Sequence, residues 1–412
     1  MKMYLVDFFA SGHHPEYAAH LASYLKEAGH EPTVWSWGPS ATLTPVTDRQ
    51  LPLRFVQIRS DSISQGFLRS LYRIAEGLHT VYAEAETENV EIVHLLYLDN
   101  AELPLWWNLA VLHRELAVST VATLFWPHFV DARGEWRPLR KLMHRITKCA
   151  LKQTLKGDRL SAVFMHTPHL RDRVLASFRG WDLANRFVVV PDPVYESPVR
   201  DASSVEQSRR ALGLPQDKVI FLFFGNLSRI KGADLLLDIV DKLPSAAYVT
   251  FAGPPSPDLG IDWEKEARSR AGSNNVRIDV GHIPNDMMPS YFEAANAVVL
   301  PYRSSFLGTS GVLNQALSAR KPVIAANVGE VGRLVAENRL GIVVEPDDTL
   351  GLLSGIQRYM VTRETLDSSV RAQAAAYAAA NHWRITASIV LETYERHIRA
   401  RGKTLGGTDS AI

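Results

Sequence analysis

The sequence has little of several features that mark other classes of protein. It contains one cysteine, Cys149, so an intramolecular disulfide framework is excluded and a thiolate metal cluster is not expected. Its 45 lysines and arginines against 44 aspartates and glutamates leave a net charge of +1, which gives no overall bias towards nucleic acid or acidic partners. No uninterrupted apolar stretch approaches the ~18–20 residues that span a bilayer.

Several catalytic and cofactor motifs are also missing. The first predicted strand is followed by Ser11-Gly12-His13-His14 instead of G-x-G-x-x-G, so the dinucleotide-binding fingerprint of dehydrogenases is absent. No Asp-x-Asp or His-Glu-x-x-His pattern supports a metal site, and no G-x-S-x-G elbow supports a serine hydrolase. We therefore expect neither a metal nor a bound cofactor.

The composition is that of an ordinary globular protein. Of the 412 residues, 46% are hydrophobic and 22% are charged, which excludes disordered and fibrous classes. At roughly 100–200 residues per domain, this length favours two domains. The acidic Asp7 lies where a signal peptide would need its apolar region, so we expect a cytoplasmic protein.

Apolar runs alternate with helical patterns in both halves, such as the helix expected over 234–243, which predicts parallel sheets covered by helices on both faces. The predicted strands are 4–9, 33–37, 92–98, 118–126, 162–165 and 187–190, then 219–224, 248–252, 276–278, 297–300, 322–326 and 341–344. The predicted fold class is therefore α/β, with two doubly wound Rossmann-like domains at 1–192 and 193–380. A C-terminal helix within 381–412 is expected to return to the first domain. Ligands of such folds bind at the carboxyl ends of the strands, and here also in the cleft between the domains.

Three strand-to-helix loops carry candidate binding groups. Gly12 allows close backbone approach by a ligand, or makes only a tight turn. In the loop 225–232, Arg229 and Lys231 suit a diphosphate, although a solvated pair of cations is the alternative. The glycine-bearing loop 304–311 leads into a helix whose free N–H groups attract phosphate, and Thr309 or Ser310 can also cap that helix.

The second half closely resembles one family in the order of its motifs. These are Gly225 with Lys231-Gly232, Gly253, Gly281-His282-Ile283, Tyr291 with 297–301, 315–317 with 321–325, and 341–344. This order resembles the donor-binding domain of the GT-B nucleotide-sugar glycosyltransferases of the retaining family-4 group. The first half resembles them less closely, through the Gly12 loop, residues 29–31 and the strand order.

The resemblance implies roles for particular residues. Lys231 matches a lysine on the donor diphosphate, while the family's arginine position is Asn226, with Arg229 as a stand-in. His282 and Ile283 match the segment that contacts the nucleobase. The implied donor-binding set is Gly12, Gly225, Asn226, Arg229, Lys231, His282, Ile283, Gly308, Thr309, Ser310, Gly311, Val312, Leu313 and Gln315.

One departure from the family concerns its paired glutamates, which lie eight residues apart. The corresponding positions here are Leu307 and Gln315. Gln315 can bond a ribose hydroxyl, whereas Leu307 cannot replace a carboxylate that positions the sugar. Ser304, Ser305 or the backbone at Gly308 are alternatives for that task.

The first half supplies the candidate catalytic and acceptor residues. His128 follows a predicted strand, in the region where the family places a histidine near the reacting sugar, and a structural role is the alternative. We assign His128, Lys231 and Arg229 as catalytic residues. His13, His14 and Asp99 are the candidate acceptor residues.

A basic stretch stands out against the neutral total charge. Residues 137–159 contain eight cations and one acid, Asp158, together with an apolar stripe at helical spacing. Such a helix can lie on an anionic membrane surface, or its stripe can pack on the sheet and leave the cations in water. Cytoplasmic location with peripheral membrane contact is thus one expectation.

The leading hypothesis is a retaining, metal-independent glycosyltransferase that moves a hexose-type sugar from a nucleoside diphosphate donor to an acceptor hydroxyl. The acceptor is a saccharide, a lipid-linked molecule or a small molecule, and no nucleic acid is involved. The alternative is a non-catalytic relative that binds a nucleotide sugar or a partner transferase. A sugar epimerase or phosphorylase is a third reading, which no motif favours.

Overall fold

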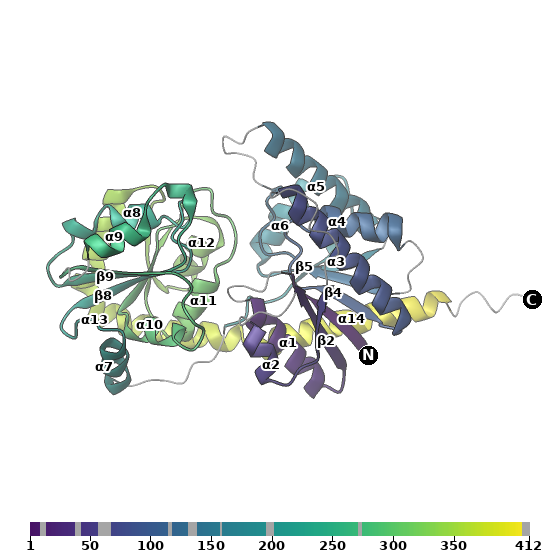
Figure 1. Ribbon diagram of the computed structural model, residues 1–412, viewed down its shortest axis with the longest axis horizontal. Coiled ribbons are helices and arrows are strands. Elements are labelled where there is room, and N and C mark those ends of the chain that lie inside the picture. The colour runs from purple at the N-terminus through teal and green to yellow at the C-terminus, as the bar shows by residue number, and fades with distance from the viewer. Residues whose placement is uncertain are drawn as a thin grey trace, which may run out of the picture. The chain divides into compact units, whose positions relative to one another are not determined.

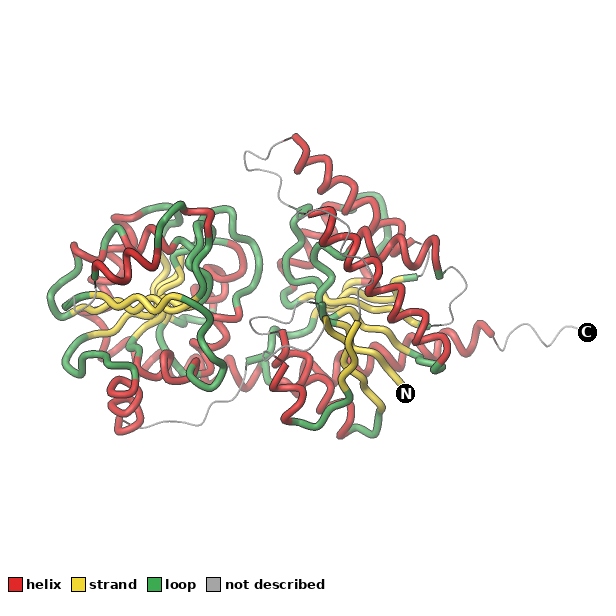
Figure 2. Tube along the Cα trace, in the orientation of Figure 1, coloured by secondary structure: helices red, strands yellow, loops and turns green. Residues whose placement is uncertain are grey.

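The computed structural model describes residues 1–8, 14–37, 43–56, 67–113, 118–130, 138–156, 159–194, 202–270 and 274–405. The chain divides into two compact units. Unit 1 comprises Met1–Asp192 and Trp383–Ile412, and unit 2 comprises Pro193–His382. In both units strands alternate with helices along the chain (Figure 2), so the predicted α/β class is confirmed.

In the described residues of unit 1, a seven-stranded parallel sheet has the order β3-β2-β1-β4-β5-β6-β7. Its central strands β1, β4, β5 and β6 are almost wholly buried, because helices cover both faces and apolar side chains are needed on each. The strands are β1 (Lys2–Val6), β2 (Glu31–Trp37), β3 (Leu53–Val56), β4 (Ile92–Leu95), β5 (Ser119–Thr123), β6 (Leu160–Met165) and β7 (Phe187–Val189).

The helices of unit 1 form a layer on each face of this sheet. Figure 1 shows α3, α4 and α5 on one face, and α1 and α14 on the other. The helices are α1 (His14–Glu27), α2 (Thr44–Asp48), α3 (Phe67–Thr87), α4 (Glu102–Trp107) followed by the π-helix η2 (Asn108–Leu112), α5 (Pro138–Lys156), α6 (Pro168–Ser177) and α14 (Trp383–Leu405).

Helix α14 comes from the end of the chain and packs in unit 1 beside α1 and β6. The Tyr394 hydroxyl lies 2.6 Å from Nδ1 of the buried His94, whose Nε2 lies 2.8 Å from the Thr123 hydroxyl. Burial lowers the pKa of His94 to about 3, so its ring is neutral and can pair with two hydroxyls. Thr386 donates to the carbonyl of Pro191 at 2.8 Å. These buried polar contacts fix α14 on the sheet of unit 1.

The described part of unit 2 has a six-stranded parallel sheet with the order β10-β9-β8-β11-β12-β13. Its core gathers apolar side chains from the central strands and from the first half of α13. The strands are β8 (Val219–Phe224), β9 (Ala247–Gly253), β10 (Val276–Val280), β11 (Ala297–Leu300), β12 (Val323–Ala326) and β13 (Gly341–Val344).

In unit 2, α8 and α9 lie on one face of the sheet and α10 on the other (Figure 1). The helices are α7 (Ala202–Ala211), α8 (Ala233–Leu237), α9 (Trp263–Ser269), α10 (Met288–Ala294), α11 (Gly311–Ser318), α12 (Gly329–Glu337) and α13 (Thr349–Ala380). Among the described residues, no helix of either unit has both the length and the apolar character to cross a bilayer.

Some elements differ from the sequence prediction. The helix expected over 234–243 ends at Leu237 and is followed by a separate 3-10 turn, Val240–Lys242. Strand β3 was not predicted, because it is only four residues long and Arg54 interrupts its apolar pattern. The run 118–126 is a strand only as far as Thr123, and its remainder forms the loop that carries His128.

Candidate functional site

Glycines shape the carboxyl edge of the sheet in unit 2, where strands β8, β9 and β10 end. Gly225 has φ +100°, and a Cβ atom on Gly253 would lie 2.1 Å from the Gly225 carbonyl oxygen. Gly281 donates its N–H to the Gly253 carbonyl at 3.0 Å. At Gly232, φ is +68° and a Cβ would lie 1.9 Å from the Pro301 carbonyl oxygen. Side chains at these positions would push the loops apart.

Lys231 is the best-defined cation of this edge. Its Nζ donates to the Tyr302 hydroxyl at 2.9 Å and lies 4.2 Å from the centroid of the Tyr302 ring and 5.0 Å from that of Phe306. The side chain is half-buried, and its ammonium group is attracted to the faces of both aromatic rings. Lys231 comes from the loop after β8 and Tyr302 from the loop after β11. The structure therefore joins two loops that are about 70 residues apart in sequence.

The same network reaches the N-terminus of α11. The Tyr302 hydroxyl lies 2.9 Å from Ser310 Oγ, and Ser310 is the N-cap residue whose Oγ accepts from the Leu313 N–H at 3.4 Å. A Cβ built on Gly225 would lie 3.7 Å from Val312, so the first turn of α11 adjoins the β8 loop. The structure thus brings together Lys231, Gly225, and the loop and helix start at 308–313. Helix N–H groups and a lysine aimed at one region suit an anion.

The other residues predicted to bind the donor lie on the neighbouring loops and make fewer contacts with this network. Asn226 and Arg229 are exposed, and the Arg229 backbone N–H donates to Asp258 Oδ2 at 3.1 Å. His282 is exposed and Ile283 half-buried, directly after Gly281 with φ +123°. The half-buried Gln315 lies one turn into α11.

Leu307 occupies a tightly packed position at the same edge. A Cβ on Gly329, the first residue of α12, would come within 2.8 Å of the Leu307 backbone. Arg303 holds this loop through ion pairs with Asp234 at the start of α8 and with Asp347, the latter at 3.1 Å. Leu307 is therefore held beside α12 by backbone packing, with an aliphatic side chain where the resembling family has a carboxylate.

The carboxyl edge of the sheet in unit 1 carries a cluster of acids and one histidine. His14 Nδ1 lies 3.0 Å from Asp7 Oδ2, and the His14 ring packs edge-on against Tyr97 at 4.5 Å between centroids. The buried Asp99 accepts from the backbone N–H of Phe125 at 3.0 Å and from that of Trp126. The residues come from the ends of β1 and β4 and from the start of α1, so the fold brings His14 and Asp99 to the same edge of the sheet. Gly12 and His13 lie outside the described residues.

Burial sets the protonation of this cluster. Burial raises the pKa of Asp99 to about 6, although the hydrogen bonds that Asp99 accepts from the backbone of Phe125 and Trp126 act to lower it. Burial, and then the charge of Asp99, raises the pKa of Glu102 to about 8. Burial acts to lower the pKa of His14, but the charges of Asp7 and Asp99 outweigh it and the pKa is raised. Close to neutral pH the cluster thus contains a protonated Glu102, while the charges of Asp7 and Asp99 favour the charged form of His14.

His128 lies next to the segment that Asp99 anchors. Its half-buried ring stacks on Trp126, with centroids 5.1 Å apart, and lies 6.4 Å from the ring of His144 on α5. His166, at the end of β6, is buried against Phe125 at 4.5 Å, and neither of its ring nitrogens has a hydrogen-bond partner among the described residues.

Sequence reasoning missed Asp7, Tyr97, Glu102 and His166 in unit 1 and Tyr302 in unit 2. Each of these residues lies at or just beyond the carboxyl end of a strand or at the start of the following helix. That position is the signal that could have found them.

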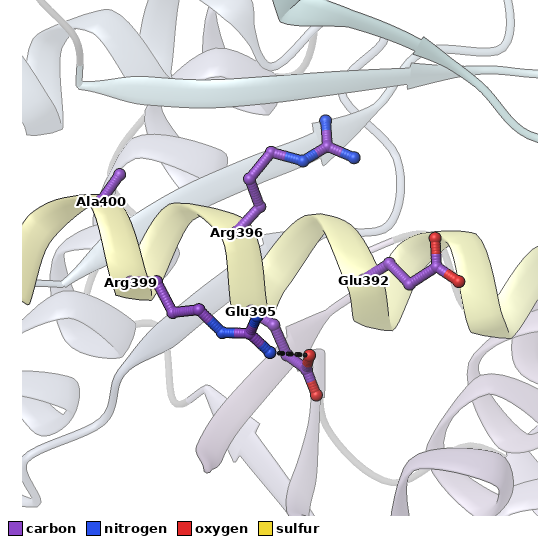
Figure 3. Close-up of a pocket in the computed structure, with 5 residues that line it drawn as sticks. All are labelled: Glu392, Glu395, Arg396, Arg399 and Ala400. Atoms are coloured by element: carbon purple, nitrogen blue, oxygen red, sulfur yellow. Dashed lines mark hydrogen bonds and ion pairs between the residues drawn. The ribbon is translucent and has the colours of Figure 1, made fainter.

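A shallow hollow lies on α14, away from these clusters in the fold of unit 1. Glu392, Glu395, Arg396, Arg399 and Ala400 line a space of about 460 Å³. Figure 3 shows Arg399 directed at Glu395, to which it is bound at 2.7 Å, while Arg396 points away from that pair. Its described lining comes from one helix, and two of its four charged residues, Glu395 and Arg399, form a surface ion pair. We do not assign a reaction to it.

Comparison with known proteins gives a family similarity for part of unit 2. Residues 218–361 match the family described as glycosyl transferases group 1. The matched residues include Lys231, Tyr302 and Ser310, so the network described above lies inside the matched region.

Curated relatives match part of the chain. D-inositol 3-phosphate glycosyltransferase 1 of Catenulispora acidiphila is 30% identical over 209 residues, which are 48% of this chain and 49% of that protein. The D-inositol 3-phosphate glycosyltransferase of Streptomyces scabiei is 28% identical over 64% of this chain and 65% of that protein. The chain spans about half the length of several of the curated relatives that it matches.

Solved structures match both units. HepE of Anabaena in complex with UDP has a TM-score of 0.71 at 17% identity, covering 96% of this chain and 100% of that one. Sucrose-phosphate synthase of Thermosynechococcus elongatus has a TM-score of 0.71 at 19% identity, covering 97% of this chain and 100% of that one. At these identities the likeness concerns the fold, and the predicted GT-B fold is confirmed.

Proposed function

We propose that this protein is a glycosyltransferase that moves a hexose-type sugar from a nucleoside diphosphate sugar to an acceptor hydroxyl. The transfer retains the anomeric configuration and needs no metal. Unit 2 binds the donor and unit 1 the acceptor. The observation that carries the proposal is the network of Lys231, Tyr302 and Ser310 at the N-terminus of α11.

The network suits a diphosphate because of the direction of its hydrogen bonds. The Lys231 ammonium can only donate, so the Tyr302 oxygen accepts from it and the Tyr302 O–H is free to donate to Ser310. Ser310 Oγ then accepts from both Tyr302 and Leu313, which leaves its own hydroxyl hydrogen for a ligand. A lysine, a serine hydroxyl and the first N–H groups of α11 together form a donor-rich, positively charged pocket edge.

These groups would act on the departing diphosphate. In the transfer, the bond between sugar C1 and the phosphate oxygen breaks, a bond from C1 to the acceptor oxygen forms, and negative charge gathers on the diphosphate. Lys231 and the helix N-terminus stabilise that charge more strongly than they stabilise the intact donor. Arg229, on the exposed side of the same loop, adds a second cation. The nucleobase is assigned to the backbone around His282 and Ile283.

The donor class has support from the structural neighbours. HepE is solved with UDP and with UDP-glucose, and this chain has the same fold. UDP-glucose is therefore the first donor to test. The curated relatives are named as D-inositol 3-phosphate glycosyltransferases, and they match about half to two thirds of this chain, so the acceptor is left open to saccharides, lipid-linked molecules and small molecules.

Unit 1 supplies the acceptor side of the proposal. Asp99 and His14 would orient an acceptor hydroxyl, and His128, held by its stack on Trp126, would orient the sugar. Asp99 has a pKa of about 6, so it can accept a hydrogen bond as a carboxylate near neutral pH. We place the reaction in the cytoplasm, a compartment that suits a protein with one unpaired cysteine.

The test combines binding and turnover. UDP, ADP and GDP and their glucose conjugates are titrated by calorimetry, and donor consumption is followed with a panel of acceptors and with EDTA present. We expect Lys231→Ala to lower donor affinity and kcat/KM by about 100-fold, which corresponds to the loss of a charge-assisted bond. Lys265→Ala, which removes an exposed lysine of α9, is the matched control and should behave as the wild type. His128→Ala should keep the affinity for the nucleotide and lose turnover.

A second function, nucleotide-sugar binding without turnover, is motivated by Leu307. No carboxylate stands at that position to hold the sugar. If the wild type binds a nucleotide sugar in a Lys231-dependent manner but consumes no donor with any acceptor, the enzyme proposal fails and the binding function replaces it. Turnover by the wild type that is lost in Lys231→Ala decides for the enzyme.

A further inference from the structure

Exposed large apolar side chains of unit 1 concentrate on the helices that cover one face of its sheet. Figure 1 shows α3, α4 and α5 side by side on that face, and α4 packs against both neighbours. The exposed fractions are 52% for Leu142 and 37% for Ile146 on α5, 47% for Trp107, 41% for Val111 and 47% for Leu112 on α4 and η2, and 45% for Tyr72 on α3. Single exposed apolar residues are ordinary, but such a group on adjacent helices indicates an interaction surface.

Helix α5 shows how this surface is built. Its buried residues Leu151 and Leu155 lie on the side that faces the protein. Leu142 and Ile146 are one turn apart and, at 100° per residue, project from the opposite side. The apolar stripe predicted from the sequence is therefore divided, and its N-terminal part does not pack on the sheet.

Basic side chains lie next to the exposed apolar residues of α5. Lys141 and Arg145 are exposed beside Leu142 and Ile146, and the sequence of α5 contains no aspartate or glutamate. Farther along, Lys148 lies 5.4 Å from the Phe178 ring, and Lys152 lies 3.9 Å from the Trp181 ring. Burial, and then the charge of Lys152, lowers the pKa of Lys148, as expected where cations crowd together. These contacts hold the C-terminal half of α5 to the protein and leave its N-terminal half projecting.

We propose that the exposed side of α5, with the adjoining α4–η2 segment, docks on an anionic lipid bilayer. This lipid-docking face consists of Lys141, Leu142, Arg145 and Ile146, with Trp107 and Leu112 beside them. A bilayer offers both chemistries that the face requires, since anionic headgroups attract the cations while the interfacial region takes up the leucine, isoleucine and tryptophan side chains. A second copy of this chain is a poor occupant, because a two-fold contact through α5 would bring two basic helices together.

The experiment is vesicle flotation of the full chain in the absence of any nucleotide sugar, so its outcome does not depend on the proposed activity. Vesicles of phosphatidylcholine are compared with vesicles that also contain phosphatidylglycerol, at low and high salt. The wild type should float only with phosphatidylglycerol and less at high salt. The double variant Lys141→Gln/Arg145→Gln should partition about thirtyfold more weakly, and Leu142→Ser/Ile146→Ser about tenfold or more.

The control is Leu350→Ser/Val361→Ser on α13 of unit 2. These residues are 72% and 87% exposed, so the change in surface polarity is similar but lies outside the proposed face. This control should float as the wild type does, and all variants should unfold at the same temperature. The proposal is overturned if the wild type ignores phosphatidylglycerol, or if both double variants bind vesicles as well as the control. A dimer in size-exclusion chromatography that Leu142→Ser/Ile146→Ser dissolves, without flotation, would assign the face to a second copy instead.

Discussion

The Tyr302 hydroxyl is the group whose removal tests the donor site most directly. It bridges Lys231 Nζ and Ser310 Oγ, each at 2.9 Å, and so links the β8 loop to the cap of α11. Tyr302→Phe deletes only this oxygen. The ring remains, with Lys231 Nζ 4.2 Å from its centroid, so the cation keeps its aromatic contact while losing its hydrogen bond.

The expected magnitude follows from the two bonds lost. A bond to a charged group is worth about 1.5–3 kcal/mol and a neutral one about 0.5–1.5 kcal/mol, so the free energy of unfolding should fall by roughly 2–4 kcal/mol. If Lys231 loses its orientation towards the diphosphate, the hydrogen bond from its ammonium group to the nucleotide is lost. Losing about 1.5–3 kcal/mol of binding free energy weakens the affinity for the nucleotide roughly 10- to 100-fold.

Tyr359→Phe is the matched control within unit 2. The Tyr359 hydroxyl is also bridging, since it donates towards Asp367 Oδ1 at 2.8 Å and the Asn296 carbonyl at 3.0 Å. It is likewise buried, but Asn296 precedes β11, at the amino edge of the sheet. The control should lose similar stability and keep the wild-type affinity.

Calorimetric titration with UDP, ADP and GDP measures the nucleotide affinity, and urea unfolding measures the free energy of unfolding, so the two effects are separated. Equal affinity of Tyr302→Phe, Tyr359→Phe and the wild type for the nucleotide that binds best would refute the assignment of this network to the diphosphate. Weakened binding by both variants would show that the effect comes from general destabilisation of unit 2.

Two further predictions concern the glycine turn of unit 2 and the acidic cluster of unit 1. In urea unfolding, Gly232→Ala should destabilise unit 2 by several kcal/mol more than Gly260→Ala. The two glycines have similar φ angles of +68° and +66°, but only a Cβ atom at position 232 would clash with backbone, 1.9 Å from the Pro301 carbonyl oxygen. Equal losses of stability would contradict that geometry. In the folded protein the pKa is about 8 for Glu102 and about 6 for Asp99, above the values of these side chains in the unfolded chain. The folded state therefore binds more protons than the unfolded state, so the free energy of unfolding should fall as the pH rises from about 4 to about 8. Glu102→Gln should flatten this fall in thermal unfolding between pH 5 and pH 8, and the exposed Glu27→Gln should not; a wild-type slope in Glu102→Gln would refute the buried, protonated state.

Most strands of both sheets were predictable, because buried parallel strands are continuous apolar runs bounded by glycine and proline. β8 is one such run, with five of its six residues buried. The prediction failed for β3, where Arg54 lies at the sheet margin, and for α8, which ends at Leu237 where the apolar period still continues. The extent of each of these two short elements depends on which neighbouring elements cover it, and the local sequence pattern contains no information on those neighbours.

The candidate site was predictable where one loop contains its own signal. Lys231 follows a strand and a glycine, and Ser310 precedes an apolar helix that it caps, so both were identified from local chemistry. Tyr302 was missed because a tyrosine after a proline carries no such signal. The acids Asp7 and Glu102 were missed because they become buried only when β1, β4 and β5 lie next to one another, and that burial raises the pKa of Glu102.

The sequence by itself determined the α/β class, most of the strand positions, and the presence of a cation and a capping serine in strand-end loops. These properties follow from short-range periodicity and from backbone hydrogen bonding, which act within a few residues. Only the tertiary structure decided that Tyr302 joins Lys231 to Ser310, that His14 meets Asp7 and lies in the field of Asp99, and that Tyr394 of α14 pairs with the buried His94. The physical reason is the strand order of a parallel sheet, which brings the carboxyl ends of sequence-distant strands to one edge and buries polar groups there together.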